Sequence, residues 1–227
     1  TKSSDVTWPE QWGQKTCLMG VINVTPDSFS DGGLYLDPVN ALSRASRILN
    51  EGVDVIDIGA QSTRPGAEEI GSVEELRRLM PTLAAIRSKH KDALISVDTF
   101  LPEVALKSLE LGANWINDIT GGRRYPDMFN IVADAKCPFV IMHSRGDSKT
   151  MDKCTSYLDV EREVRQVLLR RTDQALSSGV LQQNLIWDPG IGFAKTTEQN
   201  LLLLRGLSSL RSEGFPLLVG PSLKRFI

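Results

Sequence analysis

The stretch VINVTPDSFSDGG, residues 21–33, marks the point where an apolar run changes into a polar loop. Residues 18–22 are apolar and β-prone, and the Asn, Thr, Ser, Asp, Pro and Gly residues that follow should end a strand. A helical pattern over residues 38–49 comes next. Strand-to-helix loops of this kind build the active sites of α/β proteins. The hydroxyl, carboxylate and N–H groups of this loop suit an oxyanion or a hard metal ion, and an ordinary surface loop is the alternative interpretation.

The composition is typical of a globular domain without a strong charge. The chain has 227 residues, of which 41% are hydrophobic and 24% are charged, and its formal net charge is −2. This balance provides no basic field, so we expect no nucleic-acid partner and no membrane partner. We find no signal-peptide pattern and no apolar run long enough to span a bilayer. Three cysteines without metal-like spacing, Cys17, Cys137 and Cys154, favour a reducing compartment, either the cytoplasm or the mitochondrial matrix.

Apolar strand candidates alternate with amphipathic helical stretches along the chain. Helical periodicity is clear over residues 38–49, 73–89 and 158–176. The strand candidates cover residues 17–23, 53–58, 94–97, 115–116, 139–142, 185–187 and 217–219. Because parallel strands need crossover helices, this alternation predicts βα units in a parallel sheet. Two architectures fit it, an open doubly wound sheet and a (β/α)8 barrel.

Polar residues at the strand ends favour the barrel. The signature Gly-x-Gly-x-x-Gly of dinucleotide-binding open sheets is absent after the first strand candidate. Nearly every strand candidate ends in a polar or charged residue, namely Asn23, Asp57, Asp98, Asn117, His143, Asp188 and Ser222. An open sheet concentrates its site at one switch point, whereas a barrel collects residues from many strand ends on one face. We therefore predict an α/β fold of the (β/α)8 TIM-barrel class.

This barrel should lack its last βα unit in the sequence given. Eight strands with their helices typically take about 250 residues. The seventh strand candidate ends near Gly220, and the chain stops at Ile227. We therefore divide the chain into an irregular N-terminal lead-in at residues 1–16 and a C-terminally incomplete barrel domain at residues 17–227.

Two basic residues near strand ends are candidate anion ligands. Arg64, in the loop at residues 61–66, offers a planar fork of N–H donors that matches phosphate oxygens, and Thr63 adds a hydroxyl group. Lys224 brings positive charge to the seventh strand end, where it can neutralise a substrate carboxylate or bind a ring nitrogen or carbonyl. A solvated surface position is the commoner fate of such residues and is the competing interpretation.

Three strand-end residues suit a flat heterocycle. Asp98, Asn117 and Asp188 each follow an apolar strand candidate, where a helix N-cap is the ordinary explanation for Asp or Asn. If all three meet at one barrel mouth, their carboxylate and carboxamide groups match a ring edge with several N–H donors, such as that of a pyrimidinone. His90 and His143 have no partner spacing that would support a zinc site or a nucleophilic triad.

The chain resembles the dihydropteroate synthase family of pterin-binding barrels, the folate-pathway enzymes targeted by sulfonamides. The resemblance runs from about Leu18 to Ile227. Its motifs are INVTPDSFSDGG at 22–33, DIGAQSTRPG at 57–66, SVDT at 96–99, NDITGG at 117–122, MH at 142–143, DPGIGF at 188–193, and Ser222 with Lys224. The first two are long and highly specific, so their occurrence in this order leaves little room for coincidence.

The resemblance implies a transferase that condenses (7,8-dihydropterin-6-yl)methyl diphosphate with 4-aminobenzoate and releases pyrophosphate. It implies Mg²⁺ as cofactor, contacted by Asn23. Arg64 with Thr63 would handle the diphosphate, and Asp98 would stabilise the pterin cation, so that Asp98, Arg64 and Lys224 form the catalytic set. The implied substrate-binding residues are Asp98, Asn117, Asp188 and Lys224 for the pterin, and Ser222, Pro65 and Phe193 for the aminobenzoate.

Two departures from the family pattern leave alternatives open. The family usually has Ser-Arg-Lys where this chain has Ser222, Leu223 and Lys224, and its C-terminal Arg-x-His element is absent here. We therefore expect that the chain as given is incomplete and, alone, poorly active or inactive. A non-catalytic pterin-binding domain and, further behind, a pterin-dependent methyltransferase barrel are the competing functions. The expected partners are the two small-molecule substrates, with a homodimer and fusion to other folate-synthesis domains as open possibilities.

Overall fold

The computed structural model describes residues 7–25, 38–63 and 66–221. The chain divides into two compact units. The first unit comprises Thr1–Ser62 and Glu69–Asn117, and the second comprises Thr63–Glu68 and Asp118–Ile227. Of the predicted site residues, Arg64, Pro65, Ser222 and Lys224 lie outside the described residues, as does Leu223.

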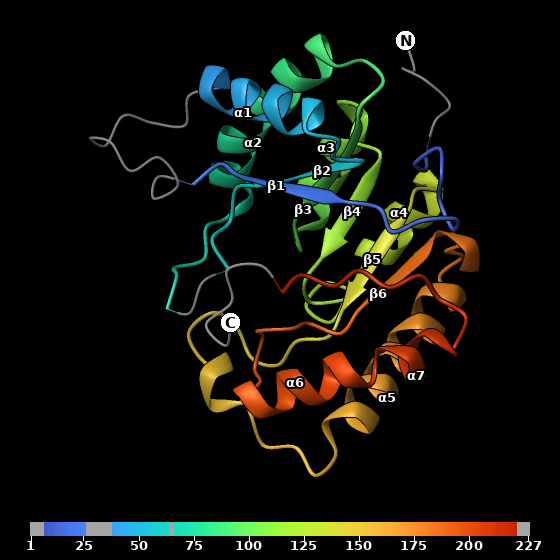
Figure 1. The fold of residues 1–227 in the computed structure, drawn as a ribbon. Helices are drawn as coiled ribbons and strands as arrows, with labels where there is room; N and C mark the ends of the chain where they lie inside the picture. Colours follow the sequence, from blue (N-terminus) through green and yellow to red (C-terminus); the bar gives the residue numbers. More distant parts are fainter. Residues whose placement is uncertain (1–6, 26–37, 64–65, 222–227) are drawn as a thin grey trace. The chain divides into compact units, whose positions relative to one another are not determined.

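The first unit is a parallel sheet in which a helix connects each strand to the next one along the chain (Figure 1). Strands β1, β2, β3 and β4 are hydrogen-bonded in sequence order, all parallel. Helix α1 packs against α2, and α2 packs against α3. The elements are β1 (Met19–Asn23), α1 (Pro38–Asn50), β2 (Val55–Gly59), α2 (Ser72–Lys89), β3 (Leu94–Asp98), α3 (Pro102–Glu110) and β4 (Trp115–Asp118). The last residue of β4 is assigned to the second unit.

The second unit continues the same alternation. Strands β5 and β6 pair in parallel, and α5 packs against both β5 and α6. Figure 1 shows α5 beside α6, with α7 continuing from the end of α6. The elements are α4 (Met128–Ala135), β5 (Phe139–Met142), η2 (Met151–Lys153), α5 (Val160–Ser177), η3 (Gln182–Asn184), β6 (Leu185–Asp188), α6 (Thr197–Arg205) and α7 (Leu207–Arg211). None of the helices in the described part of the chain is long and apolar enough to cross a membrane.

Six of the seven predicted strands are confirmed, and the seventh is wrong as a strand. Residues 217–219 contribute only an isolated parallel bridge between Leu217 and Trp187. The pairing rests on two hydrogen bonds, from Trp187 N to Pro216 O at 2.9 Å and from Leu218 N to Trp187 O at 2.8 Å. Pro216 has no N–H group, so it cannot donate a further ladder bond on the N-terminal side of the bridge.

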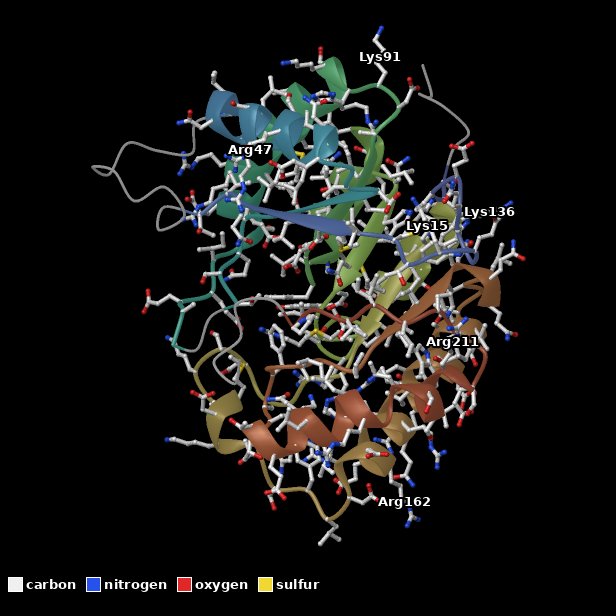
Figure 2. All side chains as sticks on the ribbon, viewed as in Figure 1. Lys15, Arg47, Lys91, Lys136, Arg162 and Arg211 are labelled. Carbon is white, nitrogen blue, oxygen red and sulfur yellow. The ribbon has the colours of Figure 1, made fainter. Side chains whose placement is uncertain are left out.

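Each unit has an apolar core. In the first unit, Ile22, Ile58 and Ile116 are fully buried. In the second, Trp187 is fully buried and its indole N–H donates to Thr172 Oγ1 at 2.8 Å, which satisfies the ring's polar atom. The basic residues labelled in Figure 2 are all exposed, namely Lys15, Arg47, Lys91, Lys136, Arg162 and Arg211.

Arg87 forms hydrogen bonds to two chain segments near β3 in the first unit. From the last turn of α2, its guanidinium donates to Gly112 O at 2.8 Å and to Asn114 Oδ1 at 2.7 Å. It also donates to Lys91 O and Ala93 O, both at 2.8 Å. These acceptors belong to the connection between α2 and β3 and to the connection between α3 and β4, so one side chain satisfies acceptors from two separate segments.

We predict that Arg87→Met lowers the free energy of unfolding by about 2–4 kcal/mol, because several partly buried carbonyl groups lose a charged donor together. Urea denaturation of the full-length protein measures this loss. The matched control is Arg77→Met, since Arg77 pairs with Glu74 on an exposed face of the same helix and should cost less than about 1 kcal/mol. Equal losses in the two variants would contradict the role assigned to Arg87.

Candidate active site

Strand-end residues of the first unit lie in one register row. Asn23 stands opposite Gly59, and Gly59 stands opposite Asp98. Asp98 in turn stands opposite Asn117. Residues in register on parallel strands point to the same face of the sheet, and these four lie at or beside the C-terminal strand ends. The structure therefore brings together three residues predicted for the site, Asn23, Asp98 and Asn117.

Gly59 leaves the space that the Asp98 side chain occupies. A Cβ atom on Gly59 would lie 3.3 Å from Asp98 Cβ and 3.4 Å from Asp98 Oδ2, so a larger residue would crowd the carboxylate. The helix-cap interpretation of Asp98 is wrong. Helix α3 begins after Leu101, which takes the N-cap position without a side-chain cap. The Asp98 carboxylate is half-buried at the strand end and does not cap the helix.

Asp57 and Asn117 form a buried polar pair beside this row. Asn117 Nδ2 donates to Asp57 Oδ2 at 3.3 Å, and the two side chains are 8% and 4% exposed for Asn117 and Asp57. Within the described residues, Asp57 Oδ1 and Asn117 Oδ1 are buried and have no hydrogen-bond partner. Burial raises the pKa of Asp57, and the neighbouring Ser96 hydroxyl and Asn117 amide partly oppose this rise. Two unpaired acceptors therefore face the strand-end region of the first unit.

A second buried carboxyl group, Glu75, lies in the first turn of α2. Its side chain is fully buried, and neither carboxyl oxygen has a hydrogen-bond partner within the described residues. Burial raises the pKa of Glu75 to about 7, with the Thr99 side chain and the charge of Arg78 opposing the rise. Thr99 follows Asp98 directly, so this carboxyl group belongs to the surroundings of the β3 end.

In the second unit, Asp188 ends β6 and shapes the turn that follows. Asp188 Oδ1 accepts a hydrogen bond from Gly190 N at 2.7 Å, and Asp188 O accepts one from His143 N at 2.9 Å. Gly190 has φ of +72°, and a Cβ atom there would overlap the carbonyl oxygen of His143. Only glycine permits this close approach of two backbone segments. Asp188 is therefore held at the strand end by its own turn.

Asp118 has a structural role in the second unit. Its Oδ1 accepts from Thr120 N at 2.7 Å and from Thr120 Oγ1 at 2.8 Å, and its Oδ2 accepts from Gly122 N at 2.9 Å. Burial raises its pKa, and these hydrogen bonds oppose the rise. Because both carboxylate oxygens accept hydrogen bonds from the following loop, Asp118 stabilises that loop.

Two further predicted residues lie in the second unit. Thr63 begins the segment Thr63–Glu68, where Gly66 N donates to Ser148 O at 2.7 Å. Phe193 is half-buried in the turn after β6, and its N–H donates to Gly190 O at 3.1 Å. The structure thus places Asp188, Thr63 and Phe193 in one unit and the row of Asn23, Asp98 and Asn117 in the other.

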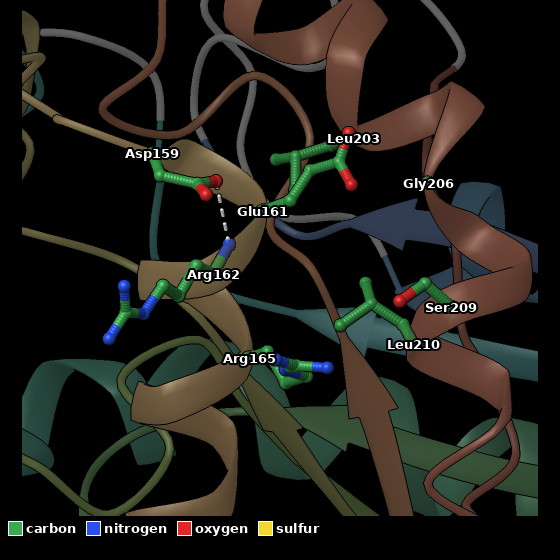
Figure 3. A pocket seen from close by; sticks show the side chains of 8 residues that line it. All are labelled: Asp159, Glu161, Arg162, Arg165, Leu203, Gly206, Ser209 and Leu210. Carbon is green, nitrogen blue, oxygen red and sulfur yellow. Dashed lines mark hydrogen bonds between the residues drawn. The ribbon is translucent and has the colours of Figure 1, made fainter.

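A cavity of about 140 Å³ in the second unit lies away from these residues. It is lined by residues of α5, α6 and α7, among them Asp159, Arg162 and Gly206 (Figure 3). Asp159 Oδ1 accepts from the backbone N–H of Arg162 at 3.0 Å and so caps α5, and Arg165 pairs with Glu213 at 3.6 Å. None of the predicted site residues that the structure describes lines this cavity.

Asn23, the residue predicted to contact Mg²⁺, lies within the part of the chain that the structure describes. Over residues 7–25, 38–63 and 66–221, no group of three or more His, Cys, Asp or Glu side chains could hold a metal ion. Asn23 is exposed at the end of β1 and offers one carboxamide oxygen. Mg²⁺ commonly takes only one or two protein ligands together with water and substrate phosphates, so a single carboxamide ligand agrees with its usual coordination. The Mg²⁺ assignment stays a prediction.

Two residues with perturbed surroundings were not in the predicted site. Asp57 is predicted only as a polar residue near a strand end, and the signal for a larger role is its position as a carboxylate in the otherwise apolar run at 55–58. Lys195 is half-buried, and its ammonium contacts the turn after β6. Nothing in the sequence distinguishes Lys195 from an exposed lysine, because its partners are backbone carbonyls and a histidine 52 residues away.

We predict that the difference in unfolding free energy between Glu75→Gln and the wild type grows by about 1–3 kcal/mol from pH 4.5 to pH 8. The pKa of Glu75 rises on folding from 4.5 to about 7. Its stabilising contribution is therefore complete below pH 4.5 and is lost as the pH rises through 7, whereas glutamine does not titrate. Urea denaturation at several pH values measures the difference. Glu74→Gln is the control, because the pKa of Glu74 is lowered to about 2 and lies outside this window. A flat difference for Glu75→Gln would show that this group is not protonated.

Comparison with known proteins relates this arrangement to one family. Residues 19–227 match the family described as pterin binding enzyme. The dihydropteroate synthase of Synechocystis sp. is 48% identical over 216 residues, covering 95% of this chain and 74% of that protein. The mitochondrial folate synthesis bifunctional protein of Pisum sativum is 44% identical over 229 residues, covering 95% of this chain and 44% of that protein.

Solved structures give the same relationship. The dihydropteroate synthase of Xanthomonas albilineans with 4-aminobenzoic acid has a TM-score of 0.87 and 40% identity, covering 94% of this chain and 75% of that one. The same enzyme in complex with 7,8-dihydropteroate has a TM-score of 0.82 and 37% identity, with coverage of 94% and 75%. This likeness confirms the TIM-barrel class predicted from the strand ends. The chain belongs to the pterin-binding enzyme family.

Proposed function

We propose that this chain condenses (7,8-dihydropterin-6-yl)methyl diphosphate with 4-aminobenzoate to give 7,8-dihydropteroate and pyrophosphate. The observation that carries the proposal is the pair of buried, unpaired acceptors at Asp57 Oδ1 and Asn117 Oδ1. Leaving such atoms without donors costs free energy, and a pterin ring edge with several N–H donors would pair them. The functions named for the Synechocystis and Xanthomonas relatives support the same reaction.

The residues of each unit have distinct proposed roles in holding the pterin. Asp98 and Asn117 present a carboxylate and a carboxamide in adjacent register positions. Asp188 presents a carboxylate whose turn is fixed by Gly190. Family resemblance adds Lys224 as a further pterin ligand. Carboxylates that accept N–H bonds from a neutral ring also stabilise positive charge that develops on that ring.

The reaction then follows from charge separation. The bond between the pterin methylene carbon and the diphosphate oxygen breaks, and both bonding electrons leave with the diphosphate. Arg64, with Thr63, stabilises that departing negative charge, and Asp98 stabilises the pterin cation that stays behind. The amine nitrogen of 4-aminobenzoate, bordered by Pro65, Phe193 and Ser222, then forms the new C–N bond and loses one proton to solvent.

Magnesium belongs to this proposal through the diphosphate. Asn23 would supply a carboxamide oxygen to the ion, and the diphosphate oxygens and water would complete its coordination. When bound, Mg²⁺ would neutralise part of the charge on the leaving group.

The wider setting of the reaction is also a proposal. We expect the two small molecules as the principal partners, with no nucleic acid and no membrane surface involved. The bifunctional pea relative makes fusion to a second folate-synthesis activity a natural arrangement, and a mitochondrial setting agrees with that relative's name. A homodimer and a cytoplasmic location remain open expectations.

A pair of variants separates a synthase from a pterin-binding domain without turnover. We predict that Asp188→Ala weakens the binding of 6-hydroxymethylpterin by at least tenfold, since lost hydrogen bonds to a buried ring cost about 1–3 kcal/mol. Arg64→Ala should leave that binding unchanged and lower turnover severely, because its interaction strengthens as charge develops in the transition state. Titration calorimetry and a pyrophosphate-release assay on the full-length protein measure the two effects.

The matched controls are exposed residues of the same types. Asp173→Ala and Arg211→Ala remove an exposed charge each and should leave both measurements unchanged. If the wild type bound the pterin but released no pyrophosphate, the binding-domain alternative would replace the synthase. Normal turnover in Arg64→Ala would also contradict the proposed mechanism.

A further inference from the structure

The turn after β6 has positive φ angles, which residues other than glycine rarely adopt. Gly190, Gly192 and Ala194 have positive φ values of 72°, 82° and 50°. For Ala194 the left-handed conformation costs roughly 1 kcal/mol. Side chains from other elements hold this turn, because Asn200 Oδ1 accepts from Gly192 N at 2.9 Å and Tyr157 donates to Ala194 O at 3.0 Å. The turn is therefore fixed by contacts beyond its own sequence.

Lys195 supplies the central contact of this turn. Its ammonium Nζ lies 2.9 Å from Gly190 O, 2.9 Å from Phe193 O and 3.0 Å from His143 Nδ1. An ammonium group has three N–H donors, and here three acceptors surround it. Two of them are the carbonyl groups at the two ends of the Gly190–Phe193 turn, and the third belongs to the residue that follows β5.

This arrangement fixes the proton on His143. Because the ammonium has no acceptor capacity, Nδ1 must accept, and the ring proton of neutral His143 lies on Nε2. Burial, together with the nearby charges of Lys195 and Arg145, lowers the pKa of His143 well below 6.5, which agrees with a neutral ring. His143 is fully buried, and its Nε2 has no partner within the described residues.

Burial of the Lys195 amine brings its pKa near neutral pH. Burial lowers the pKa of Lys195 to about 7; Asp188 opposes this change and Arg145 adds to it. His143 faces the same amine as a neutral acceptor. Below pH 7 the ammonium has a donor for each of its three acceptors. Above pH 7 the neutral amine has two N–H groups, so one of the three loses its donor.

We propose that Lys195 is a positioning residue, which locks the turn between Asp188 and Phe193 against His143 and so holds both side chains in their binding geometry. This inference rests on the proposed function, in which Asp188 contacts the pterin and Phe193 borders the aminobenzoate. Lys195 acts through the Gly190 and Phe193 carbonyls, and it need not touch either substrate.

Removing the ammonium should act on substrate binding through the turn. Lys195→Met keeps an unbranched apolar stem but leaves two carbonyl groups and a ring nitrogen without donors. The KM for the pterin diphosphate and the KM for 4-aminobenzoate should each rise about tenfold, the equivalent of roughly one lost hydrogen bond of 1.4 kcal/mol. Because the bond-breaking step depends on other residues, kcat should change less than either KM.

The test uses the full-length protein with three variants. Steady-state pyrophosphate release gives kcat and both KM values for the wild type, Lys195→Met, Lys195→Arg and the control Lys153→Met, from pH 6 to pH 8.5. Lys153 is exposed in η2 and should behave as the wild type. Ionisation of the diphosphate affects all proteins equally, so the informative quantity is the KM ratio of each variant to the wild type. For Lys195→Met this ratio should be largest at pH 6 and should fall as the pH passes through 7.

Lys195→Arg keeps the positive charge throughout this pH range, so the ratio of its KM to the wild-type KM should fall as the pH passes through 7, even if its KM values differ. It also keeps the test decisive if Lys195→Met does not fold. A ratio of the Lys195→Arg KM to the wild-type KM that stays constant from pH 6 to pH 8.5 would overturn the inference, as would Lys195→Met values equal to those of Lys153→Met. In each case an active wild type would leave the proposed function standing. A wild type that binds pterin and releases no pyrophosphate would overturn the proposed function, and this inference with it.

Discussion

Parallel register is the constraint on which the candidate site depends. In the first unit, the register aligns Asn23, Gly59, Asp98 and Asn117 across four strands. Because side chains alternate between the two faces of a strand, a slip of one residue would send a side chain such as Asp98 to the opposite face. The buried aliphatic residues between these positions, such as Ile58 and Val97, resist that slip, since it would exchange them with polar side chains of the other face, such as Asp57. The core thus sets the geometry of the polar strand ends.

Glycine supports this geometry in both units by the absence of a side chain. At Gly59 the missing Cβ leaves space for the Asp98 carboxylate. At Gly190 it lets the turn after β6 approach the His143 carbonyl, and a positive φ adds a second reason for glycine. The two cases differ physically. A larger residue at position 59 would crowd the Asp98 carboxylate. A larger residue at position 190 would disrupt the backbone contact with His143 that holds the turn after Asp188.

Unpaired buried polar atoms cluster around the strand ends of the first unit. Asp57, Ser96 and Asn117 each have a buried polar atom without a hydrogen-bond partner within the described residues, and so does Glu75 beside them. Each such atom reduces stability, since the native state gives up hydrogen bonds to water without replacing them. Extended apolar burial in β2 and β3 offsets that loss. A ligand with complementary N–H donors would pair these atoms and remove that loss.

The sequence by itself determined the βα alternation, six of the strands and the polar residues that end them. These follow from local apolar runs and from turn residues that any parallel sheet would need. The long motifs at 22–33 and 57–66 also indicated the family, which the comparisons confirmed. The roles of Asn23, Arg64 and the other predicted site residues stay predictions, because a motif identifies a residue without giving its contacts.

Tertiary structure alone decided which polar residues are buried and what they touch. Asp118 and Asp98 look equivalent in the sequence, yet the first is paired with its own loop and the second lies beside Gly59 without capping α3. The environment of Lys195 likewise depends on His143, 52 residues away, and on two carbonyls that face it only after the turn has formed. Desolvation and hydrogen bonding are set by neighbours in space, and local sequence patterns do not specify those neighbours.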